Sequence, residues 1–245
     1  MERFGAPILR NGGEVMQGKN NFKRILSGIM SVAMAATLLP SLPAVAEDAA
    51  EKYPYTMFAA SDTEGAITIN ANNFCVNGNI ATNGTIVSSG NMNVNGTKTE
   101  NADEEMIYIL KKLNYSYFSG DNVETYADDY SFEDLNININ NPMDVNGTLE
   151  LTGNINLNSG IKAVEDVTIN GEVKNTNNSV ICSETGDINI ETSNVNFSGL
   201  IYAPYGDINI DTDNLNLNNV IIIGQTITID CPSTVSYTHL RAHET

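Results

Sequence analysis

Residues 186–201 have the sequence GDINIETSNVNFSGLI, and residues 206–221 have the sequence GDINIDTDNLNLNNVI. Nine of the sixteen aligned positions are identical at an offset of twenty residues, and most of the others are conservative. Nearer the N-terminus, Ile67 and Ile86 are nineteen residues apart. A repeat period near twenty residues is typical of solenoid proteins, in which each repeat stacks on its neighbour.

Apolar and polar residues alternate within each period, as in Ile188 and Ile190 and then Val195 and Phe197. This period of two predicts short strands with one side facing inward. Asn-Gly pairs, which tolerate the positive φ of a tight corner, separate the strands at 77–78, 83–84, 95–96, 146–147 and 170–171. We therefore predict an all-β fold: a right-handed, single-stranded parallel β-helix with a stacked isoleucine core and asparagine ladders.

The coils are predicted over 66–97 and 135–232, with one interruption over 98–134. In this insert, residues 101–113 predict an amphipathic helix, with Asn101 as the N-cap. Half of the chain's ten tyrosines also lie there, at 108, 115, 117, 126 and 130. The fold is thus expected to carry one helical, tyrosine-rich insert.

Two roles for the insert remain open. Long excursions from a repetitive fold often carry function, and exposed tyrosines suit contact with sugars or proteins. Alternatively, apolar residues such as Met106, Ile107, Ile109 and Leu110 attach the helix to the flank of the β-helix or cap it.

The N-terminus has a basic segment, an apolar run over 25–42 and the sequence Ala-Val-Ala before Glu47. This arrangement predicts a signal peptide over 1–46 with cleavage between Ala46 and Glu47. A retained membrane anchor is the alternative, because the run approaches the length of a membrane span. Residues 47–65 are expected to form an N-terminal segment or cap.

The C-terminal segment, residues 233–245, differs from the preceding sequence. From Val235 it reads VSYTHLRAHET, which contains both histidines of the chain. This stretch resembles translated sequencing-adapter read-through. We expect a non-native tail without function, with the natural protein continuing beyond about Pro232.

Composition excludes several function classes. The formal net charge is −18, and removal of residues 1–46 leaves 7 Lys and Arg against 28 Asp and Glu. Such a chain is a poor partner for nucleic acid or an anionic membrane. Between 47 and 234 it has neither His nor Arg. Histidine triads, histidine-metal sites and bidentate arginine contacts are therefore excluded there, and we predict no catalytic residue, no cofactor and no membrane span in the mature chain.

Acidic and amide side chains alternate over residues 207–213 and, one coil earlier, over 187–191. In extended strands they would share one outer face, where stacked like charges repel each other. A Ca²⁺ ion could relieve that repulsion. The alternative, which we favour, is a solvated acidic strip without metal that also discourages aggregation.

Three cysteines, Cys75, Cys182 and Cys231, make a poor disulfide framework for an exported chain because their number is odd. Cys75 and Cys182 stand among apolar strand residues and are expected to be small buried hydrophobes.

The segments 53–62, 66–97 and 199–207 resemble the asparagine-rich, N-terminal β-solenoid region of large exported surface proteins of Gram-positive gut bacteria. The resemblance covers about residues 53–230. It implies a stalk or scaffold that precedes further modules, often of adhesive type.

These observations predict a secreted or cell-surface protein that acts without catalysis as a scaffold, stalk or adhesin module. Its expected partners are a cell-surface glycan or protein, or further copies of itself joined end to end. The main alternative is a self-assembling, polymer-forming β-solenoid, because the ends of a β-helix expose strand edges. A glycan-acting β-helix enzyme is the third alternative, by analogy of fold alone.

Overall fold

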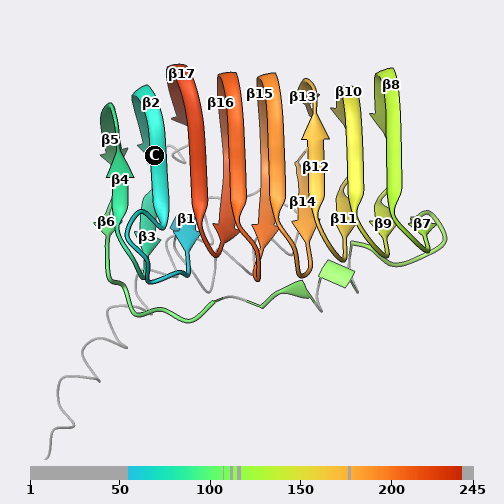
Figure 1. Ribbon diagram of the computed structural model, residues 1–245, viewed down its shortest axis with the longest axis horizontal. Coiled ribbons are helices and arrows are strands. Elements are labelled where there is room, and N and C mark those ends of the chain that lie inside the picture. The colour runs from blue at the N-terminus through green and yellow to red at the C-terminus, as the bar shows by residue number, and fades with distance from the viewer. Residues whose placement is uncertain (1–54, 107, 111–112, 115–116, 176–177, 239–245) are drawn as a thin grey trace, which may run out of the picture.

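The computed structural model describes residues 55–238, with the exception of 107, 111–112, 115–116 and 176–177. These residues form a β-solenoid of about eight turns with a spacing of about twenty residues. Its seventeen strands pair in parallel as one continuous sheet, and Figure 1 shows them side by side along the long axis. The predicted parallel β-helix is confirmed.

Each turn contributes strands to three sides of the solenoid. We name the sides after their outer surfaces. The acidic face consists, in spatial order, of β4 (Ile86–Ser88), the first parts of β2 (Ile67–Asn77), β17 (Ile227–Thr238), β16 (Ile208–Gly224) and β15 (Ile188–Ala203), then β12 (Val167–Asn170) and the first parts of β10 (Leu149–Leu157) and β8 (Tyr130–Ile139).

The asparagine face follows in each turn. It consists of β5 (Asn91–Asn95), the later parts of β2, β17, β16 and β15, then β13 (Val173–Lys174) and the later parts of β10 and β8. The third side, the covered flank, consists of β6 (Lys98–Thr99), β3 (Asn79–Thr82), β1 (Tyr55–Ala59), the last parts of β16 and β15, then β14 (Ser179–Ser183), β11 (Ile161–Ala163), β9 (Met143–Val145) and β7 (Glu124–Tyr126).

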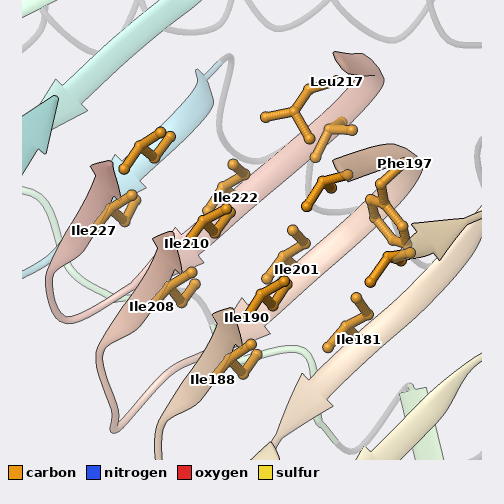
Figure 2. Packing of buried hydrophobic residues seen from close by; sticks show 14 of the residues in the cluster. Ile181, Ile188, Ile190, Phe197, Ile201, Ile208, Ile210, Leu217, Ile222 and Ile227 are labelled. Atoms are coloured by element: carbon orange, nitrogen blue, oxygen red, sulfur yellow. The ribbon is translucent and has the colours of Figure 1, made fainter. Parts of the chain in front are cut away.

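The core is a set of apolar columns that run along the solenoid axis. Ile188 pairs with Ile208, which pairs with Ile227, and all three are fully buried. Figure 2 shows such residues stacked on successive strands, with Phe197 and Leu217 in the neighbouring column. Burial of one such side chain contributes roughly 1.5–3 kcal/mol, so the repeated inward positions stabilise the stack turn by turn.

The order of the turns in space differs from their order in the sequence. The first turns, β1 to β6, stack on the last strand, with Ile67 of β2 opposite Ile227 of β17. Strand β1 lies between β16 and β3 and so supplies the third side of the turn begun by β17. The described part of the expected N-terminal cap, from Tyr55 onward, is therefore an internal strand, because both of its edges are paired.

The insert connects the two ends of the solenoid along the covered flank (Figure 1). The predicted helix over 101–113 is wrong in its first half, since Asn101 and Asp103 have positive φ values of 52° and 55°. Helical residues begin at Leu110. The physical reason lies in Asn83, whose side chain accepts a hydrogen bond from the Glu104 backbone and donates one to the Glu104 carbonyl, at 2.8 Å each. These bonds hold the segment extended against a corner.

The second set of coils begins earlier than the predicted residue 135. Strands β7 and β8 already belong to the solenoid, and the rings of Tyr126, Tyr130 and Phe132 occupy positions opposite buried Val145, Leu149 and Leu151. The Tyr126 and Tyr130 rings are 3.8 Å apart between centroids, and those of Tyr130 and Phe132 are 6.4 Å apart. These tyrosines therefore close the end of the core.

Candidate functional site

The asparagine face presents a repeated array of amides. Where the side chains are described, buried and outward positions alternate along these strands, so that Ile155 and Leu157 point inward while Asn154 and Asn156 point outward. Sixteen of the chain's 35 asparagines occupy the outward positions here: Asn73, Asn77, Asn91, Asn93, Asn95, Asn136, Asn138, Asn140, Asn154, Asn156, Asn158, Asn194, Asn196, Asn214, Asn216 and Asn218. Three columns of amides result, interrupted among the described side chains by Glu172, Cys75, Lys174 and Ser198, and by the strand β17.

Hydrogen bonds between turns order these columns. The Asn156 amide nitrogen donates to Asn138 Oδ1 at 3.0 Å, and that of Asn216 donates to Asn196 Oδ1 at 3.3 Å. Similar bonds join Asn95 to Asn77 at 2.7 Å. The predicted asparagine ladders are thus present, and they fix the amides in a lattice with about 4.8 Å between turns and roughly 7 Å between columns.

The acidic face has a different composition although the same turns build it. Its outward residues include five acids, namely Glu133, Glu150, Glu191, Asp211 and Asp230. At the corner before this face, Asp187 Oδ1 accepts the Asp207 backbone N–H at 2.7 Å, and Asp207 Oδ1 accepts that of Thr226 at 3.1 Å. These two carboxylates therefore act as caps for the backbone of the next turn.

The choice between a calcium site and a metal-free strip stays a prediction; one oxygen of each of these two carboxylates accepts a backbone N–H. Among the described residues, no group of three or more His, Cys, Asp or Glu side chains could hold a metal ion. The expected alignment over 207–213 also fails at Asp213. Thr212 is buried, whereas the next inward residue is Leu215, so the chain bends between the two faces at this point.

The insert packs against the covered flank through a second apolar cluster. From the insert, Met106, Ile109, Leu113 and Phe118 are buried, and the flank contributes Phe58, Ala81, Val180, Cys182, Leu200, Tyr202, Ile221 and Ile223. The hydroxyl of the fully buried Tyr202 accepts the Ile109 backbone N–H at 3.1 Å. Of the two roles left open for the insert, its described apolar side chains therefore support attachment to the flank. Tyr108 remains 59% exposed and packs on Tyr205.

Lys162 forms the most enclosed charged cluster of the described residues. Its ammonium group lies 2.8 Å from Glu184 Oε1, 3.1 Å from Asp144 Oδ1 and 2.8 Å from Asn114 Oδ1. Burial disfavours the charged form, but the hydrogen bonds and charges of both carboxylates outweigh it and raise the pKa of Lys162. An open cleft of about 470 Å³ lies beside the cluster. The protonated, fully bonded ammonium suits anchorage of the insert better than catalysis.

The cysteines occupy three environments, and all three are free thiols. Cys182 is fully buried, as expected, and burial together with the charge of Glu184 raises its pKa. The expectation for Cys75 is wrong: Phe74 and Val76 point inward, so strand alternation places the half-buried Cys75 on the asparagine face. Cys231 is buried and its pKa is raised by burial.

Some predicted features fall outside the described residues. These are the signal peptide over 1–46, its cleavage between Ala46 and Glu47, and the tail beyond Thr238. Strand β17 includes residues 233–238, whose backbone pairs with β2 from Thr234 to Tyr237. No helix among the described residues has the length and apolar character needed to span a membrane.

Comparisons with known proteins relate the fold of this chain to a solved structure. No family model matches the chain, and no curated protein sequence matches it. The solved structure is that of an ice binding protein from an Antarctic Biological Consortium. It shares 11% sequence identity at a TM-score of 0.36, over 74% of this chain and 86% of that chain. At that level of similarity we take no function from it.

Proposed function

We propose that this chain is a non-catalytic module of an exported cell-surface protein, which acts as a rigid scaffold and presents a contact surface in the manner of an adhesin. The observation that carries the proposal is the asparagine face. It is an open and almost uncharged surface, held in register by inter-turn hydrogen bonds such as Asn156–Asn138. A stack of nine strands on the covered flank gives the scaffold a length of roughly 40 Å.

The chemistry of the charged groups supports a role without catalysis. Lys162 is buried between its partners and keeps its proton, because its pKa is raised. The carboxylates of Asp187 and Asp207 are occupied by backbone N–H groups. Structural roles thus account for the charged groups that are held most firmly.

The two ends of the solenoid disfavour the alternative of end-to-end polymers. Among the described residues, the covered flank has nine strand layers, from β6 to β7, whereas each other face has eight. If β8 of one copy stacked on β4 and β5 of the next, β6 and β7 would have to occupy the same layer. Lys98 and Glu124 also lie in the column that holds buried Ile80 and Met143 elsewhere. Short edge strands and inward charges are common devices against edge pairing.

Two measurements on the full chain test this proposal. After expression with its leader in a Gram-positive host, mass spectrometry of surface-released protein should show an N-terminus at Glu47. Electron microscopy and sedimentation should show dispersed particles about 40 Å long. Retention of the protein inside the cell would overturn export, and filaments would establish the self-assembling alternative in place of the scaffold.

A further inference from the structure

We propose that the asparagine face is a binding surface for a neutral, hydroxyl-rich polysaccharide chain. This inference rests on the proposed adhesin function and names the class of ligand for its contact surface. The middle column of the face carries it best: Asn138, Asn156, Asn196 and Asn216. Lys174 stands in the same column, between Asn156 and Asn196.

The amides of the middle column have hydrogen-bonding capacity beyond the ladder. An asparagine side chain has two N–H donors and a carbonyl oxygen with two lone pairs. The bond from Asn156 to Asn138 uses one donor and one lone pair, as does the bond from Asn216 to Asn196, and Asn216 Oδ1 also accepts a bond from Asn218. Asn138, Asn196 and Asn216 are exposed. Sugar hydroxyls both donate and accept hydrogen bonds, so they can pair with the N–H groups and the carbonyl oxygens of these amides.

Charge selects a neutral polymer. The chain has a formal net charge of −18, and five acids project from the adjacent acidic face. Polyanions such as nucleic acids and uronic-acid polymers are therefore repelled. On the asparagine face itself, the charges among the described outward side chains are those of Lys174 and Glu172, which form an ion pair with each other. A neutral polysaccharide meets no unpaired charge on this face.

The regular spacing favours a polymer over a small sugar. The described cleft of about 470 Å³ lies on the covered flank beside Lys162 and not on the asparagine face. Each amide contact on a flat, hydrated surface is weak. A polymer that contacts several turns at once binds with higher affinity than a single sugar unit, because each further contact forms at a high effective concentration.

The comparison with the acidic face distinguishes binding from simple solubility. The chain keeps that neighbouring face soluble with carboxylates such as Glu150, Glu191 and Asp211. The same device would serve on the asparagine face, where outward positions such as Asn138, Asn196 and Asn216 are also exposed. Amides held in register there instead offer directional donors and acceptors without the repulsion that carboxylates exert on other groups.

The test uses the mature full chain and depletion from suspensions of cellulose, chitin and starch granules, with polygalacturonate as the anionic comparison. The binding variant is Asn156→Ala/Asn196→Ala/Asn216→Ala. The matched control is Asn170→Ala/Asn189→Ala/Asn209→Ala on the acidic face, which removes the Asn209–Asn189 ladder bond at 2.9 Å. Circular dichroism and thermal unfolding verify that both variants fold.

We expect wild-type protein to be depleted by at least one neutral polysaccharide and not by polygalacturonate. The binding variant should bind that polysaccharide at least about tenfold more weakly, while the control stays within about twofold. Absence of wild-type binding to all three neutral polymers would overturn the inference, as would equal losses in both variants. Because export and particle length are measured separately, these outcomes leave the scaffold proposal intact.

Discussion

The asparagine face and the covered flank are two outer surfaces of the same turns, but another segment of the chain covers only the flank. Outward positions on the flank carry apolar residues such as Val180, Leu200 and Tyr202, and the insert covers them. Outward positions on the asparagine face carry amides, and among the described residues no segment packs over them. The outward residue of each strand, and not the strand itself, therefore decides whether a face of the solenoid is bare or covered.

The largest effect should follow from removal of a flank residue. Tyr202→Ala deletes a fully buried ring and the acceptor of the Ile109 N–H. We expect a loss of about 3–5 kcal/mol in the free energy of unfolding, measured by urea denaturation. Tyr205→Ala is the control, because Tyr205 is 56% exposed and should cost about 0.5 kcal/mol. Equal losses would show that the flank contacts do not stabilise the fold.

Thiol labelling compares the two surfaces directly. Cys75 is half-buried on the asparagine face, whereas Cys182 is fully buried under the insert with a raised pKa. In native protein, iodoacetamide should modify Cys75 at least about a hundredfold faster than Cys182. Peptide mapping by mass spectrometry measures both rates. Similar rates would mean that the insert opens readily from the flank.

Lys162 tests the electrostatic attachment of the insert. Lys162→Met should lower the free energy of unfolding by about 2 kcal/mol. This is less than the usual loss when a buried ion pair is broken, because the side chains of Asp144 and Glu184 are 26% and 22% exposed. The control is Lys174→Met, whose ion pair on the asparagine face is exposed and worth about 0.5 kcal/mol.

The same substitution should change the pH dependence of stability. Because the folded-state pKa of Lys162 is raised, its contribution is complete below the unfolded-state value of about 10.5 and is lost as pH rises through the folded-state pKa. The difference in unfolding free energy between wild type and Lys162→Met should therefore shrink above about pH 10.5. A difference that grows with pH would contradict this assignment.

The smallest effect is expected within the asparagine ladder. Asn216→Ala removes the side-chain hydrogen bonds to Asn196 and Asn218, and both bonds are exposed to solvent. Water replaces such bonds readily, so we expect a loss of about 0.5 kcal/mol in urea denaturation. A loss above about 2 kcal/mol would assign the ladder a structural role and remove the main reason to regard it as a binding surface.

Local patterns in the sequence predicted much of this molecule. Alternation around Ile188 and Ile190 predicted inward columns, and the twenty-residue offset predicted that Ile208 stacks on Ile188. The same twenty-residue offset also predicted the asparagine ladders. The acidic strip was predicted as well, but the bend at Thr212 was not, because a buried threonine among polar residues gives no sign of a corner.

The helix prediction failed where local propensity competed with tertiary contacts. Residues 101–106 have a plausible cap and acids for a first turn. Thr82 at the end of β3 and Asn83 after it nevertheless bind their backbone, with the Ala102 N–H donating to the Thr82 carbonyl at 3.0 Å. These hydrogen bonds offset the loss of helical ones. The position of Cys75 shows the opposite case, where strict alternation would have given the right answer.

The strand period, the inward columns and the amide ladders follow from the amino-acid sequence, because they depend on spacing within and between neighbouring turns. Tertiary structure alone decided that β2 stacks on β17, that β1 fills the gap between β16 and β3, and that the insert covers one flank. The physical reason is that every turn offers nearly the same apolar columns and parallel strand edges. Local sequence therefore cannot specify which turn is the neighbour, and only the closure of the whole chain through the insert selects it.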